Sequence, residues 1–179
     1  MKKNQISIKG LTSALACGLV LLGTAGCQKD LLDKQPLSSI SDATFWRTAN
    51  DATLAQLQKL TQGLVFGSES EEPLEAVSYA APTGDLPDAQ LLQVLGEPAG
   101  AKVEKVELIP FLSNHTNDQG VTGSVALANR FKALQMYLKQ ELDGVQVYRI
   151  GAGPKIHAYA LGRDVAGRLA GFKTELTES

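Results

Sequence analysis

Apolar and polar positions follow two periods in the chain beyond residue 50. In ATLAQLQKLTQGLVF the leucines recur at helical spacing, and they are Leu54, Leu57, Leu60 and Leu64. Residues three or four apart share one face of a helix, so this stripe predicts a helix with one buried side, beginning near Asp51 and ending near Gly63. LEAVSYAA, between Pro73 and Pro82, predicts a strand, as does KVEKVELI.

Two further helices are indicated by the same helical period. The first has Asp85 as its expected cap, Pro87 in its first turn and Gly96 as its terminator. Its apolar positions are Leu91, Leu92, Val94 and Leu95. The second runs over about residues 124–142, is the longest helix expected, and is stopped by Gly144. Its apolar stripe consists of Leu127, Phe131, Leu134 and Leu138.

The end of the chain changes to short strand-like runs separated by glycine-rich breaks: VQVYRIG, KIHAYALG and RLAGFKTEL. Parallel strands need long crossovers, and none fits between these runs, so we expect an antiparallel meander that follows a strand closed by Pro110. The break GAG is followed by Pro154 and not by a helix. A phosphate-binding loop is therefore excluded at this position. The order of elements predicts an α+β fold: a three-layer α/β/α sandwich with a mixed, largely antiparallel sheet.

The first residues have the pattern of a secretory signal. Lys2, Lys3 and Lys9 precede the apolar run LTSALACGLVLLGTAG, which is too short for a convincing membrane span. Cys27 follows at once and resembles the lipobox cysteine that becomes the diacylated N-terminus of bacterial lipoproteins. Residues 1–26 are therefore predicted to be removed, leaving an exported, lipid-anchored protein at the outer membrane, facing the periplasm or the surface. The alternative is an ordinary signal cleaved nearby, with Cys27 as a free thiol.

Residues 27–50 form a polar segment that predicts a tether leading to a short helix, which Ser41 could cap. The order Cys, Lys-Asp, Leu-Leu-Asp, Pro, Ser, Phe-Trp is similar to the start of SusD/RagB-type outer-membrane lipoproteins. Those proteins need several hundred residues of helical repeats to bind glycans, and this chain is too short for them. The resemblance therefore implies a location, and it carries no glycan-binding function.

Charge and cysteine content narrow the possible functions. Without residues 1–26 the chain keeps 14 basic and 19 acidic residues, a formal charge of −5. Direct binding of nucleic acid is not expected, because phosphates require a basic face. Cys17 would leave with the signal and Cys27 would carry lipid, so no internal disulfide is expected. One hydrophobic core must then hold a single domain.

The sequence offers no recognisable catalytic or metal-binding set. His115 and His157 are far apart, and neither has a cysteine or second histidine at ligand spacing, so a structural zinc is not expected. His115 lies in the polar stretch SNHTNDQG and is expected to be solvated. His157 alternates along a predicted strand and is expected at the surface or in packing. No Ser/His/Asp or Cys/His arrangement has a mechanistic rationale, which argues against an enzyme.

The stretch FGSESEEPLEAVSY gathers four glutamates, Glu69, Glu71, Glu72 and Glu75. A solvated loop in which Ser68 or Ser70 bonds to nearby backbone would explain this composition. However, LAQLQKLTQGLVFGSESEEPLEAVSY, RFKALQMYLKQELDGVQVYRIG and YALGRDVAGRLAGFKTELTES together resemble the nuclease A inhibitor family, in the family's order. The resemblance predicts an inhibitor-like domain over residues 51–179.

Members of that family are small α/β/α proteins that block a magnesium-dependent endonuclease acting on both DNA and RNA without sequence preference. The resemblance implies that Glu69 and the final residue, Ser179, reach the magnesium ion of the nuclease. Ser68, Glu71 and Glu72 are expected to contact the same partner. Mg²⁺ binds oxygen ligands, so the carboxylate of Glu69 and the terminal oxygens of Ser179 are suitable ligands for the ion. The inhibitor would need no cofactor or metal of its own, because the partner supplies the ion.

The expected partner is a secreted or periplasmic non-specific endonuclease. A nuclease groove must be basic to hold a polyanion, so an acidic loop has the complementary charge. We expect Glu69 at the centre of the contact and Glu71 and Glu72 at its rim. The segment SNHTNDQGVTGSV is shorter than in the family and lacks an aromatic residue found in a relative, which leaves the identity of the nuclease open. The alternative function is a surface lipoprotein module that keeps the fold but binds a carbohydrate or an envelope protein.

Overall fold

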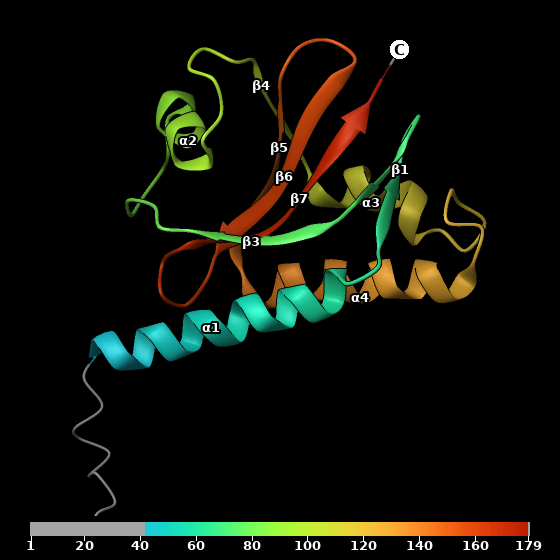
Figure 1. Ribbon diagram of the computed structural model, residues 1–179. Coiled ribbons are helices and arrows are strands. Elements are labelled where there is room, and N and C mark those ends of the chain that lie inside the picture. The colour runs from blue at the N-terminus through green and yellow to red at the C-terminus, as the bar shows by residue number, and fades with distance from the viewer. Residues whose placement is uncertain (1–41, 179) are drawn as a thin grey trace, which may run out of the picture. The chain divides into compact units, whose positions relative to one another are not determined.

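The computed structural model describes the backbone of residues 42–178 and the side chains of residues 51–178 (Figure 1). The signal, Cys27, most of the tether and Ser179 lie outside the described residues. Within residues 42–178 the helices are α1 (Asp42–Thr61), α2 (Asp88–Leu95), α3 (Leu108–Thr116) and α4 (Val125–Glu141). The strands are β1 (Val65–Gly67), β2 (Glu71–Pro73), β3 (Glu75–Tyr79), β4 (Val103–Val106), β5 (Asp143–Ile150), β6 (Lys155–Arg163) and β7 (Leu169–Thr177).

The main sheet has five strands in the order β3-β7-β6-β5-β4. All four neighbouring pairs are antiparallel, so the predicted meander of the last three strands is present, and the sheet described here contains no parallel pair. β1 and β2 form a separate antiparallel hairpin. The prediction of an α+β fold with a largely antiparallel sheet is confirmed.

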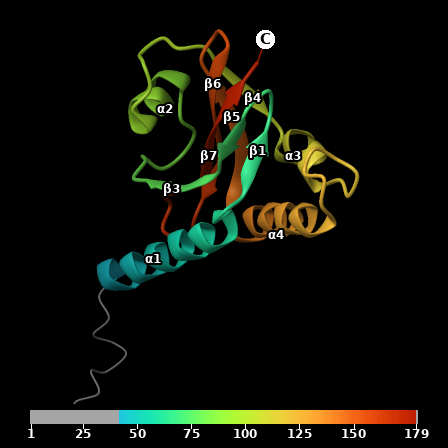
Figure 2. The ribbon, with the colours of Figure 1, turned by 45° about the vertical axis from the view of Figure 1, so that its right-hand side comes forward.

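Helices cover both faces of this sheet (Figure 2). On one face α1, α3 and α4 pack against the sheet. The buried side chains of this cluster include Leu57, Leu112, Phe131 and Leu134 of the helices and Phe172 of β7. On the other face α2 packs onto the sheet with side chains that include Leu91, Leu92, Tyr159, Leu161 and Leu169. Full burial of one phenylalanine or leucine side chain contributes about 1.5 to 3 kcal/mol, so the first, larger cluster dominates stability.

Several elements lie close to their predicted positions. α4 spans Val125–Glu141, within one residue of the prediction at each end. α2 ends at Gly96 as predicted, and this glycine has the left-handed conformation (φ 74°) in which its N–H reaches back to the carbonyl of Gln93. The predicted N-cap of α2 was wrong, however. Pro87 occupies the N-cap position, and Asp85 lies before it.

α1 differs from the prediction because two expected helices form one. It runs without a break from Asp42 to Thr61 and, at 20 residues, is longer than the 17 residues of α4. At its end the Thr61 hydroxyl donates to the Leu57 carbonyl at 2.9 Å, and Gly63 turns the chain with a positive φ of 67°. Leu64 therefore reaches the core from the connection to β1 and is not part of the helix.

The region after β4 was also predicted incorrectly. The strand ends at Val106, and α3 begins at Leu108 with Pro110 in its first turn. A proline at this point costs no helical hydrogen bond, because the first N–H groups of a helix have no partner inside it. His115 falls on α3 and is only 3% exposed, so the expectation of a solvated histidine in a loop was wrong.

The β1–β2 hairpin was not predicted, and it gives the acidic stretch a defined shape. Val65 pairs with Pro73 and Gly67 with Glu71, which makes residues 68–70 the turn between the strands. In Figure 1 the hairpin lies at the same end of the domain as the tip of β7. Glu69, Glu71 and Glu72 therefore lie on a short, two-stranded element beside the main sheet, whereas Glu75 begins β3 of that sheet.

Candidate functional site

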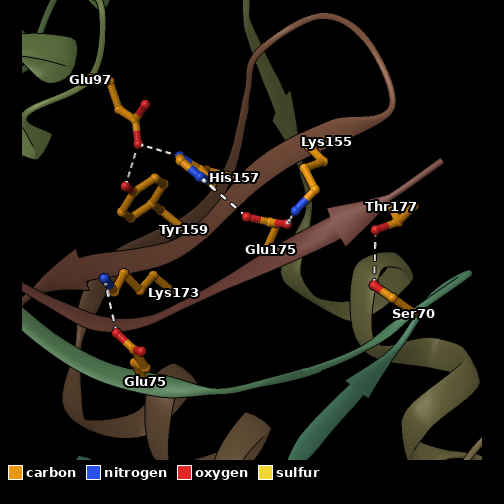
Figure 3. A network of polar contacts seen from close by, with 9 residues as sticks. All are labelled: Ser70, Glu75, Glu97, Lys155, His157, Tyr159, Lys173, Glu175 and Thr177. Carbon is orange, nitrogen blue, oxygen red and sulfur yellow. Dashed lines mark hydrogen bonds and ion pairs between the residues drawn. The ribbon is translucent and has the colours of Figure 1, made fainter.

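The turn of residues 68–70 is hydrogen-bonded to the end of β7. The Glu69 N–H donates to the Thr177 carbonyl at 3.3 Å, and the Thr177 N–H donates to the Ser68 hydroxyl at 3.2 Å. The hydroxyls of Ser70 and Thr177 share a further bond of 2.9 Å (Figure 3). All three residues of the turn thus contact one residue of β7, which fixes the loop to the main sheet.

The two serines also shape the turn internally. The Ser68 N–H and hydroxyl both donate to the Ser70 carbonyl, at 2.9 and 3.2 Å. Short hydroxyl side chains favour tight turns because they replace backbone hydrogen bonds locally. Glu69 is exposed at the centre of this turn.

The chain beyond Thr177 is fixed as far as it is described. The Glu178 N–H donates to the Pro154 carbonyl at 2.9 Å, and the Glu178 carboxylate forms an ion pair with the guanidinium of Arg149 on β5. The loop and the end of β7 are therefore neighbours up to Glu178. Ser179, the second predicted contact, lies outside the described residues, and the sequence places it two positions after Thr177.

The other glutamates face different surroundings. Glu71 is exposed and lines a hollow of about 180 Å³ beside His115, whereas Glu72 is half-buried and lines a second hollow on the main sheet. Glu75 pairs with Lys173 of β7 at 2.9 Å, and this hydrogen bond raises the pKa of Lys173. Glu75 therefore belongs to the surface of the sheet and is separate from the turn that carries Glu69.

The second hollow, of about 210 Å³, was missed by the sequence analysis. Figure 3 shows five of its side chains on the sheet surface between Glu97 and Ser70: Glu75, His157, Tyr159, Lys173 and Glu175. Its lining consists of Glu72, Pro73, Glu75, His157, Tyr159, Lys173, Thr174 and Glu175. A signal was present at the start of β6 and in the second half of β7, where polar residues alternate with more buried ones, which marks a strand with one uncovered face.

Most charged side chains around this hollow are paired with a neighbour. The Tyr159 hydroxyl donates to Oε1 of Glu97 at 2.5 Å, and Nδ1 of His157 lies 2.7 Å from the same oxygen. Burial raises the pKa of Tyr159, and the hydrogen bond to Glu97 raises it further. Lys155 donates to Glu175 at 2.7 Å, which lowers the pKa of that carboxyl. His157 is on the surface, as predicted.

Among the described side chains, those of residues 51–178, no three or more His, Cys, Asp or Glu are grouped so that they could hold a metal ion. In the same range, no helix combines the length and the apolar character needed to cross a bilayer. The turn itself presents one exposed carboxylate, that of Glu69, on a loop that is hydrogen-bonded to β7.

Comparison with known proteins identifies the family. No curated protein matches the chain. The family model described as nuclease A inhibitor-like protein matches residues 51–179, well over half of the chain, and includes the acidic turn and β7. The lipoprotein leader and the similarity to SusD/RagB proteins fall outside the matched residues and stay predictions. The resemblance of the domain is confirmed, and the chain belongs to the nuclease A inhibitor-like family.

Proposed function

We propose that this protein inhibits a magnesium-dependent endonuclease that cleaves DNA and RNA without sequence preference, and that Glu69 and Ser179 block its active site. Family membership supports a nuclease as the partner. The observation that carries the proposal is the hydrogen bond from the Glu69 N–H to the Thr177 carbonyl, because it holds the acidic turn beside a residue two positions before Ser179.

The chemistry of the two groups fits this role. Mg²⁺ takes oxygen ligands and keeps several waters, so a carboxylate can approach it directly or through one water. The Glu69 side chain and the α-carboxylate of Ser179 are both such ligands and would occupy positions otherwise taken by substrate phosphate. Magnesium belongs to the nuclease in this arrangement, and the inhibitor supplies only oxygen atoms.

The surrounding residues would support the contact in different ways. The Ser68 hydroxyl is engaged by Thr177 and Ser70, so we assign it the role of positioning the turn. Glu71 and Glu72 lie one and two residues beyond the turn and would sit at the rim, where single charges mainly speed association with a basic groove. Neither catalysis nor direct binding of nucleic acid is part of the proposed function.

A short tag added after Ser179 tests the terminal contact. We expect inhibition to weaken by about 30-fold or more, because the tag removes the α-carboxylate from a position at the centre of the contact. Titration of nuclease activity with the purified protein gives the inhibition constant. Ser179→Ala is the matched control, since it retains the α-carboxylate and should lose far less. A tagged protein that inhibits as well as the untagged one would contradict the role of the terminus.

We also propose that the protein is exported and anchored by lipid on Cys27, which would bring it to a secreted or periplasmic nuclease. Cells expressing the protein can be fractionated into membrane and soluble parts. We expect the wild type in the membrane fraction and Cys27→Ser in the soluble fraction. Cys17→Ser is the control and should stay with the membrane, because residue 17 lies in the predicted signal. Wild type found in the soluble fraction would contradict the anchor.

A further inference from the structure

His115 lies beneath the base of the acidic turn, among aromatic side chains. Its ring stacks on Phe66 of β1, with ring centroids 3.9 Å apart, and is tilted against Phe131 of α4 at 4.9 Å. Only 3% of the residue is exposed. A histidine in this position is unusual for a core, because its two nitrogens need hydrogen-bond partners that aromatic and aliphatic neighbours do not offer.

One of these nitrogens holds the strand that leads into the turn. The Gly67 N–H donates to Nε2 of His115 at 2.9 Å, and Gly67 is followed directly by Ser68. A ring nitrogen that accepts a hydrogen bond carries no proton, so the neutral ring has its proton on Nδ1. Nδ1 is buried and has no hydrogen-bond partner among the described residues. The contact with Gly67 is therefore the polar bond that fixes the ring.

A proton on Nε2 cannot coexist with this bond. It would point at the Gly67 N–H, so two donors would face each other, and a positive charge would be buried between Phe66 and Phe131. Burial already lowers the pKa of His115. The ring would have to turn away, or β1 would have to move, and either change removes the support of the turn on this side.

The charged groups around His115 give little compensation. Glu71 is the one other titratable residue among the described residues that line the hollow beside the ring. On α4, the guanidinium of Arg130 donates to the Gln62 carbonyl and Lys132 is paired with Asp118 at 2.7 Å. The residues of β1 and the rest of α3 contribute no charged side chain. Glu71 exposes its side chain on β2, directly after the turn, so a protonated ring drawn to it would disturb the same hairpin.

We propose that the neutral imidazole of His115 positions the 68–70 turn, and that protonation of His115 releases the turn and weakens binding of the nuclease in acid. This inference rests on the inhibitor function proposed above. The sign follows from the preference of the buried site for the neutral ring: the support is complete above the usual imidazole range, near pH 6.5, and is lost as the pH falls below it.

Affinities measured at two pH values test the effect on binding. The variant His115→Gln keeps a side-chain acceptor but does not titrate, so the ratio of its affinity to that of the wild type cancels the pH dependence of the nuclease itself. We expect this ratio to rise by about fivefold between pH 7.5 and pH 5.5, the effect of losing one hydrogen bond. His157→Gln is the matched control and should behave as the wild type does. A ratio that stays constant would overturn the proposal.

Nuclear magnetic resonance of the purified protein tests the coupling without any nuclease. The amide signals of residues 67–70 should titrate together with the His115 ring, at one midpoint below pH 6.5, in the wild type and in His157→Gln. They should not titrate in this range in His115→Gln. Amide signals that do not change as the His115 ring titrates would overturn the proposal. The wild-type titration alone decides this, even if His115→Gln does not fold. Coupled signals without inhibition at any pH would refute the inhibitor function and leave the coupling intact.

Discussion

Replacement of Glu69 by alanine is expected to weaken inhibition by about 30-fold or more, equivalent to about 2 kcal/mol of binding free energy. The residue is exposed at the centre of a turn that five hydrogen bonds hold in place, and none of these bonds involves the Glu69 carboxylate, so they remain in the variant. Contacts at the centre of an interface lose solvent and contribute most of the affinity, whereas rim charges contribute little. Titration of nuclease activity against the variant gives the loss directly.

Glu75→Ala is the matched control for this experiment. It also removes one negative charge from the acidic stretch, but its carboxylate is paired with Lys173 on the sheet. We expect a loss of less than about threefold, the size of a surface ion pair. Equal losses for the two variants would mean that the net charge of the region matters and the position of Glu69 does not.

Gly171→Ala is expected to destabilise the fold by about 3 kcal/mol or more. A Cβ atom at this position of β7 would lie 1.9 Å from the Ala160 carbonyl oxygen on β6 and 2.9 Å from its carbonyl carbon. These are backbone atoms at the centre of the sheet, so the clash can be relieved only by separating the two strands. Urea unfolding followed by circular dichroism should show a lower midpoint with a similar slope.

Gly67→Ala provides the comparison for this prediction. It is also a strand glycine, but a Cβ atom there would meet its nearest neighbour, a methyl group of Val121, at the ordinary contact distance of 3.7 Å. We expect a change in unfolding free energy of less than about 1 kcal/mol. A Gly171 variant as stable as this control would show that β6 and β7 are not as closely spaced as described.

The elements that the sequence predicted well are those with long, regular patterns. α4 has an apolar residue at nearly every turn, and β5, β6 and β7 are strands of eight or nine residues, rich in β-branched, aromatic and other apolar residues and separated by glycine-containing breaks. In such segments the local conformational preference of the residues agrees with the burial that the fold requires. The sequence pattern is then sufficient to predict the element. The hairpin of β1 and β2 has only three residues in each strand, too few to show a period.

α3 shows where the sequence was misleading. Pro110 was interpreted as the end of a strand, and the polarity of SNHTNDQG as a sign of solvent. Leu108, Leu112 and His115 are spaced by four and three residues and form the buried face of the helix. The signal was therefore present, but it required a histidine to be counted as a core residue. A histidine can be buried here because its Nε2 accepts a hydrogen bond from the Gly67 N–H. Only the folded chain reveals this partner.

The candidate site was predictable only in part. Glu69 and the end of the chain were connected through the family resemblance, since no periodicity relates them. The contact of the turn with Thr177 depends on the position of β7 next to β3 and beside β2, a contact between distant segments. The polar hollow near Glu97 and His157 likewise arises where α2 leaves part of the sheet uncovered, which depends on tertiary packing.

The pairing of the turn with Thr177 has a consequence for the order of synthesis. The two hydroxyls that meet there belong to residues 107 positions apart. Because a chain is made from its N-terminus, the acidic turn leaves the ribosome long before the strand that secures it. Until β7 has emerged and paired, the turn lacks its anchor. We therefore expect ribosome-bound fragments that end before β7 to leave a nearby nuclease fully active.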